Sequence, residues 1–152
     1  MPIDVDTAKA LQFDPLTVDV ERGRLRFFAK SIGETDPVYV DVDAARAADH
    51  RDLPVPPTFF FSLSLEAPGP FRYLDQLGID LRHVLHGEQS FAYQRLAYAG
   101  DRLSLQDRIV DVFAKRGGTL EFLIKQADVT RDDELVAELR TTLVVRNPEG
   151  AQ

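Results

Sequence analysis

The sequence contains no cysteine and only one methionine. Without cysteine, disulfide bonds, thiol nucleophiles and thiolate metal sites are excluded. Long apolar runs are absent too, since the densest one, residues 59–65 (Phe-Phe-Phe-Ser-Leu-Ser-Leu), is far too short to span a bilayer. There is no Gly-x-Ser-x-Gly elbow and no glycine-rich phosphate loop. Their absence disfavours a serine hydrolase and a nucleotide-binding site.

Basic charge is also scarce, with 18 Lys and Arg against 25 Asp and Glu, a net charge of -7 and a pI near 4.9. An acidic chain is repelled by nucleic-acid phosphates and by anionic membranes, so we expect neither as a partner. The start, Met1 to Asp6, lacks the basic and apolar regions of a signal peptide, and we expect a cytoplasmic protein. Three scattered histidines lack metal-ligand spacing, so no metal site is expected.

The length of 152 residues predicts one domain over residues 1–152, with its core at about 12–146. Its first half predicts helices and loops. A helix over 21–32 is predicted from an apolar stripe at i, i+3, i+4 and i+7, with Gly33 as its C-terminal cap. The stripe consists of Leu25, Phe28, Ala29 and Ile32. A second short helix follows near 44–48, capped by Asp41 or Asp43.

Prolines 54, 56 and 57 predict a stiff, extended segment, after which Thr58 is placed to cap a helix over 59–65. This segment is apolar nearly all round, so as a helix it should be fully buried. Residues 68–70 (Pro-Gly-Pro) end it, and a short helix over 71–77 stops at Gly78.

From Leu85 onward the apolar period becomes two, which predicts strands. Leu85, Gln89, Phe91 and Tyr93 are expected on one face, with His86, Glu88, Ser90 and Gln94 on the other. Three further faces are expected from Leu103, Leu105, Ile109 and Phe113; from Leu120, Phe122 and Ile124, alternating with charged Glu121 and Lys125; and from Leu135, Ala137, Leu139, Thr141, Leu143 and Val145. Turns fall at 100–101, 117–118 and 131–134. The class is α+β: a hot-dog fold, in which an antiparallel sheet wraps around one buried helix.

Several motifs follow one another in the order and spacing of a known family. They are residues 28–39 (Phe-Ala-Lys-Ser-Ile-Gly-Glu-Thr-Asp-Pro-Val-Tyr), 43–48 (Asp-Ala-Ala-Arg-Ala-Ala), 56–59 (Pro-Pro-Thr-Phe), 85–91 (Leu-His-Gly-Glu-Gln-Ser-Phe) and 99–101 (Ala-Gly-Asp). Over roughly 12–146, the chain resembles the N-terminal-type MaoC-like dehydratase domain, also called the FAS1-like dehydratase domain.

This resemblance implies a hot-dog fold that usually forms dimers by edge pairing of its sheets. It implies reversible hydration of a trans-2-enoyl thioester to an (R)-3-hydroxyacyl thioester, carried on coenzyme A or acyl carrier protein, with no cofactor. Active relatives hold a water with the Asp and His of Asp-x-Asn-Pro-Leu-His. Here Glu34 stands at the Asp position, Asp36 at the Asn position and Tyr39 at the His position. In this family, the replacements at the Asp and His positions are typical of the non-catalytic partner in heterodimeric dehydratases and of the N-terminal half in fused double hot-dog proteins.

Two interpretations of this stretch stay open. Glu34, Asp36 and Tyr39 act directly in catalysis, or they form a structural turn bent by Pro37. His86 is a further catalytic candidate, acting alone or with Glu88, unless it is an interface or core histidine. The backbone amides at Pro57, Thr58 and Phe59 are candidates for binding the thioester oxygen, in the way that an oxyanion hole does; the alternative is plain helix capping.

The leading hypothesis is a MaoC-like hydratase or dehydratase, either active as a homodimer or dependent on a second hot-dog subunit that carries the Asp–His pair. One alternative is a hot-dog acyl-CoA thioesterase, whose carboxylate activates water against the thioester carbonyl. Another is a non-catalytic module that binds acyl-CoA. All three bind a thioester, and they differ in whether a double bond, a thioester bond or neither changes.

Overall fold

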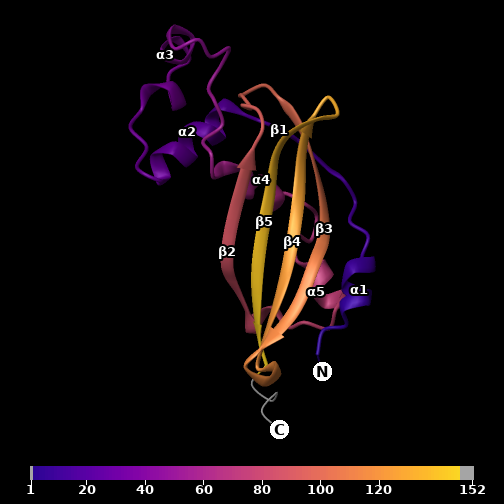
Figure 1. Cartoon of the computed structure of the whole chain (residues 1–152). Coiled ribbons are helices and arrows are strands. Elements are labelled where there is room, and N and C mark those ends of the chain that lie inside the picture. Colours follow the sequence, from indigo (N-terminus) through magenta and orange to yellow (C-terminus); the bar gives the residue numbers. More distant parts are fainter. Residues whose placement is uncertain (1, 148–152) are drawn as a thin grey trace.

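The alternating segments of the second half form the long strands of a five-stranded antiparallel sheet, in the order β1-β3-β4-β5-β2 (Figure 1). This computed structural model describes residues 2–147, so the remainder of the expected 1–152 domain lies outside the described residues. The strands are β1 (Leu16–Asp19), β2 (Val84–Tyr93), β3 (Arg102–Lys115), β4 (Leu120–Arg131) and β5 (Glu134–Arg146). The helices are α1 (Val5–Ala10), α2 (Arg22–Ser31), α3 (Val42–Ala47), α4 (Phe59–Ser64) and α5 (Arg72–Gln76), with 3-10 turns η1 (Pro37–Tyr39), η2 (Leu81–His83) and η3 (Arg116–Gly118).

Helix α4 lies against one face of this sheet, which confirms the hot-dog fold (Figure 1). Its residues Phe59, Phe60 and Leu63 are buried in one cluster with side chains from β3, β4 and β5. The helix is not fully buried, however: Phe61, Ser62 and Ser64 keep intermediate exposure, because the sheet of one chain covers only one side of it. A side of the central helix is therefore open in the single chain.

The core has two apolar clusters, divided by polar residues on the core face of the three central strands. Asp107 on β3, Lys125 on β4 and Thr141 on β5 each lie between a residue of the first cluster and one of the second. Lys125 Nζ donates to Asp107 Oδ2 at 2.8 Å, and Thr141 Oγ1 donates to Gln89 Oε1 at 2.6 Å. Paired in this way, these groups avoid the cost of unsatisfied burial.

The pattern on β4 was assigned to the wrong face. Leu123, not its neighbours Phe122 and Ile124, is fully buried, and Glu121 is only 3% exposed. The buried Glu121 carboxylate accepts the backbone N–H of Ile3 at 2.6 Å, with a further 2.6 Å bond from the Asn147 side chain. Partners distant in sequence thus hold a charge on the core face, where local alternation places it outside.

Helices α2 and α3, with η1 between them, form a lobe beyond the end of β2 (Figure 1). The lobe is joined to α4 by an edge contact between the rings of Phe28 and Phe59, whose centroids are 5.1 Å apart. As predicted, Leu25 and Ala29 are buried and Asp41 caps α3. Ile32 is 52% exposed, because the helix ends before it. Helix α1 and the short edge strand β1 were not predicted.

Candidate active site

The acidic corner at residues 33–39 is built by the end of α2 and the start of η1. Gly33 takes φ 74°, a left-handed conformation suited to glycine, and ends the helix as predicted. The N–H of Glu34 then donates to the Ala29 carbonyl at 2.9 Å. Asp36 Oδ1 accepts the N–H of Val38 at 3.1 Å, and Pro37 fixes the first residue of the turn. The corner is thus a well-bonded local turn.

Backbone amides engage the carboxylate of Glu34. Its Oε1 accepts the N–H groups of both Thr35 and Asp36, each at 2.9 Å. Both acidic side chains of the corner are therefore folded onto their own backbone.

Tyr39 shares this corner with the two carboxylates. Burial raises the pKa of its phenol above the ordinary value, and the negative charges of Glu34 and Asp36 raise it further. Since an unperturbed phenol already titrates near pKa ~10, Tyr39 is neutral at physiological pH. It can donate a hydrogen bond there but cannot accept a proton as histidine does.

His86 lies apart from its expected partner Glu88. A β-bulge at Gly87 shifts the register between them, so that His86 lies opposite Leu143 and Glu88 opposite Thr142. The two side chains consequently face opposite sides of β2, which overturns the expected His86–Glu88 pair. Instead, the His86 ring stacks on Phe61 of α4, with centroids 5.0 Å apart and planes at 25°. The bulge also places His86 on the face of Gln89, and Leu85 on the face of Glu88, which is the reverse of the expected grouping.

The start of α4 holds the three candidates for binding a thioester oxygen, but Pro57 has no backbone N–H and cannot donate a hydrogen bond to it. Thr58 is exposed at the N-cap position, but its side chain makes no capping bond. The N–H of Phe59 donates to the Pro56 carbonyl at 2.9 Å, so this amide is already engaged. The Pro57 carbonyl accepts the Tyr93 hydroxyl of β2 at 2.8 Å. These bonds fix the helix start against the edge strand.

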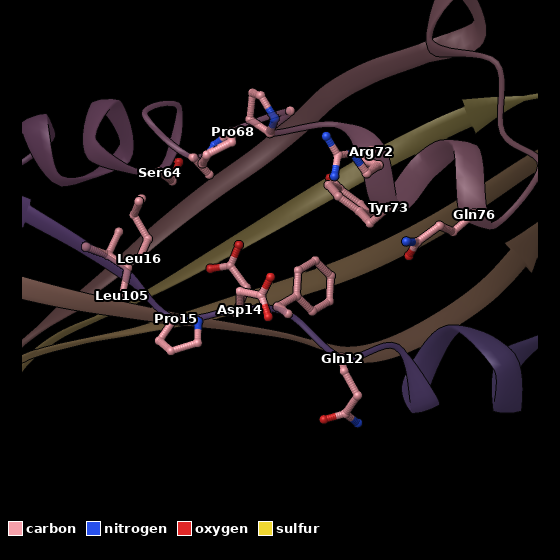
Figure 2. Close-up of a pocket in the computed structure, with 15 residues that line it drawn as sticks. Gln12, Asp14, Pro15, Leu16, Ser64, Pro68, Arg72, Tyr73, Gln76 and Leu105 are labelled. Atoms are coloured by element: carbon pink, nitrogen blue, oxygen red, sulfur yellow. The ribbon is translucent and has the colours of Figure 1, made fainter.

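A cavity of about 270 Å³ lies near the β1 edge of the sheet, between residues 12–16 and the segment from the end of α4 to α5 (Figure 2). Figure 2 shows Arg72 and Tyr73 on one wall and Asp14 and Leu16 on the other. Burial, followed by the charge of Asp107, raises the pKa of the Tyr73 phenol. None of the predicted site residues lines this cavity. Sequence patterns missed it, because its walls come from segments without a recognisable motif.

The structure therefore brings only some of the predicted site residues together. Glu34, Asp36 and Tyr39 lie together, whereas His86 belongs to the contact between β2 and α4. No cluster of three or more His, Asp or Glu side chains within residues 2–147 is arranged to hold a metal ion. Likewise, none of the helices described is long and apolar enough to cross a membrane.

Residues 8–139 match the family described as "FAS1-like, dehydratase domain region". A UPF0336 protein of Streptomyces griseus subsp. griseus is 41% identical over 134 residues, 88% of each chain. Another UPF0336 protein, from Saccharopolyspora erythraea, is 38% identical over 137 residues, which cover 87% of this chain and 86% of the relative.

Solved structures share the fold. The HadBC (3R-hydroxyacyl-ACP dehydratase) complex of Mycobacterium tuberculosis contains a chain that matches with a TM-score of 0.76 at 25% identity, covering 88% of this chain and 93% of that one. The ChsH1-ChsH2 complex of the same organism contains a chain that matches with a TM-score of 0.77 at 22% identity, covering 96% of this chain and 95% of that one. A MaoC-like dehydratase matches with a TM-score of 0.78 at 21% identity, over 91% of this chain but 42% of its own length.

Proposed function

Because the chain belongs to the FAS1-like dehydratase domain family, we propose that it is the non-catalytic subunit of a two-chain (3R)-hydroxyacyl-thioester dehydratase. In this proposal a second hot-dog chain carries the Asp–His pair that activates water. The present chain completes the acyl site from the other side of the interface. The substrate is a trans-2-enoyl or (R)-3-hydroxyacyl thioester on coenzyme A or acyl carrier protein.

The bonding of the acidic corner is the observation that carries this proposal. Hydration needs a base for water and an acid for the α-carbon. Glu34 Oε1 already accepts two backbone N–H groups, and Asp36 caps η1. Tyr39, at the histidine position, has a pKa raised above that of an ordinary phenol. This set contains no histidine, the side chain best suited to proton transfer near neutral pH, and a partner with an aspartate and a histidine supplies one.

The edge of the sheet supports the need for a partner. β2 is an edge strand of ten residues, and Leu85 and Tyr93 on it are about half exposed, as is Leu65 just after α4. A long edge with exposed apolar side chains favours pairing with another chain. The HadBC and ChsH1-ChsH2 structures with the same fold are complexes. A second hot-dog chain on β2 would also cover the open side of α4.

The test compares the purified chain with the same chain co-expressed with a hot-dog protein bearing Gly-Asp-x-Asn-Pro-Leu-His, ideally one encoded beside it. Crotonyl-CoA hydration is followed by loss of enone absorbance, and thiol release by a disulfide dye. We expect no turnover from the single chain, and absorbance loss without thiol from the complex. Hydration by the single chain at the rate of the complex would overturn the proposal, whereas thiol release would point to a thioesterase.

A further inference from the structure

A basic pocket lies at the end of the sheet where β2 begins and β5 ends. It has a volume of about 520 Å³, and its charged lining is Arg82 from η2, Arg116 from η3 and Arg146 from β5, together with His83. These three arginines gather in a chain whose net charge is -7. The pocket is therefore a local reversal of the overall charge.

Bonds within the fold place these side chains together. Asp80 caps η2 and holds the Arg82 guanidinium, with Nη2 to Oδ2 at 2.5 Å. His83 Nδ1 lies 3.2 Å from the Arg146 carbonyl oxygen and so links η2 to the end of β5. Arg116 stands in the β3–β4 turn, where its φ is 51°. The pocket thus joins three separate elements.

Two of the three guanidinium groups have no acidic partner in the described part of the chain. Arg82 is neutralised by Asp80, but Arg116 and Arg146 form no ion pair within residues 2–147. The other acid nearby, Glu121, is buried and already accepts from Asn147. Guanidinium forks match the oxygens of a phosphate group and bind it through charge-assisted hydrogen bonds. The chemistry of the pocket therefore suits a phosphate ester.

The position of the pocket connects it with the partner's site. Within one chain the pocket and the α2–α3 lobe lie at opposite ends of the sheet (Figure 1). A second hot-dog chain related by a twofold axis continues the sheet by pairing its β2 antiparallel to this one. The start of one β2 then lies beside the end of the other. The basic pocket of this chain thereby comes next to the lobe, and the catalytic corner, of its partner.

We propose that Arg116 and Arg146 bind the phosphate of the phosphopantetheine carrier whose acyl group reacts in the partner's site. This inference rests on the proposed two-chain function. It assigns the present chain a share in carrier binding, in addition to completing the acyl site. The same phosphopantetheine phosphate occurs in coenzyme A and in acyl carrier protein.

The first test uses the isolated full chain and calorimetry with coenzyme A and with pantetheine, which lacks phosphate. Coenzyme A should bind, and the double variant Arg116→Gln/Arg146→Gln should weaken that binding at least tenfold. Arg102→Gln is the matched control. Arg102 is an exposed arginine at the start of β3, whereas Arg116 directly follows the end of that strand. Absence of binding, or equal affinity in the double variant, would overturn the inference, as would pantetheine binding as tightly as coenzyme A.

The second test uses the assembled enzyme. The double variant should raise KM at least tenfold for both enoyl-CoA and enoyl-carrier protein, with kcat unchanged. A rise for the carrier protein alone would contradict phosphate binding and indicate contact with the protein surface. An active complex with unchanged KM would overturn the inference but leave the proposed function standing. Failure of the chains to assemble would instead contradict the proposed function, while binding to the isolated chain still tests the phosphate site.

Discussion

The Glu34 carboxylate accepts the backbone N–H of Asp36 at 2.9 Å, two residues further along the chain. This bond, with its companion from Thr35, turns the acidic side chain back onto the loop that carries it. The resemblance to MaoC-like dehydratases implies that the residue at this position holds a water in active relatives. Here the same carboxylate holds the turn, and the proposed function depends on that difference.

Removing this carboxylate should cost stability. Glu34→Ala deletes the acceptor of two backbone bonds on a partly exposed side chain, so we expect the free energy of unfolding to fall by about 1–2 kcal/mol. Urea unfolding measures it. Glu21→Ala is the control, because Glu21 stands before α2 without a capping bond. Equal midpoints for the two variants would show that the Glu34 bonds contribute nothing.

Asp101 should make stability depend on pH. It is 5% exposed, and its carboxylate forms ion pairs with Arg51 and Arg131 and accepts a hydrogen bond from the N–H of Tyr98. Burial alone would raise its pKa, but these donors outweigh burial and hold the pKa below its ordinary value. A depressed pKa stabilises the fold above the unfolded pKa of ~3.9, and that contribution is lost as pH falls through the folded value.

The variant Asp101→Asn should therefore lower the free energy of unfolding by about 1–3 kcal/mol at neutral pH, since it removes the charge of a buried carboxylate, and solvent screens its half-exposed partner Arg51. Its deficit against the parent chain should shrink as pH drops below about 4. Urea midpoints across this range give the curve. A deficit that stays constant down to the acid limit would mean that the charge of Asp101 is not what stabilises the fold.

Gly87 should not tolerate a side chain. A Cβ added there would lie 2.7 Å from Val144 Cγ2 and 3.3 Å from the Thr142 carbonyl oxygen. We expect Gly87→Ala to lower Tm by several degrees, because overpacking of this kind costs about 1–3 kcal/mol. Gly23→Ala, on α2 with no atom within 4 Å of its added Cβ, should leave Tm unchanged or raise it. An unchanged Tm in Gly87→Ala would contradict this close approach of β2 to β5 at Gly87.

The apolar core can be tested at α4. Leu63 is fully buried, whereas Leu65, two residues on, is 45% exposed. Leu63→Ala should lower the free energy of unfolding by about 2–5 kcal/mol through lost contacts and a cavity. Leu65→Ala should change it far less in the single chain. Similar losses in both variants, measured by urea unfolding, would contradict the placement of α4 against the sheet.

Local patterns predicted much of this fold. The stripe of α2, the Gly33 cap and the buried face of β5 all follow from residues near in sequence. The structure confirms the cap, the face of β5 and the stripe at Leu25, Phe28 and Ala29, but not at Ile32. The predicted face of β4 was wrong, because contacts with residues distant in sequence determine which side chains of this strand are buried. Glu121 and Lys125 are held on the core side by Ile3, Asn147 and Asp107, whose proximity no local period reveals.

Of the candidate site, the turn at Asp36 and Pro37 could be predicted from the sequence. Asp36 and Pro37 have the residue types of a capped turn, and that turn is present. The pairing of His86 with Glu88 failed, although a lone glycine inside a strand was a signal for a bulge. The gathering of Arg82, Arg116 and Arg146 had no local signal, because it arises only when three strand ends meet.

Reciprocal amide substitutions in the assembled enzyme test the central claim most directly. One complex carries Glu34→Gln and Asp36→Asn in this chain, and the other carries asparagine for the catalytic aspartate of the partner. Crotonyl-CoA hydration is measured for both. The account predicts that the first keeps kcat within about threefold of the parent complex and that the second loses at least a hundredfold, as expected when a catalytic base is removed. The reverse pattern would contradict it.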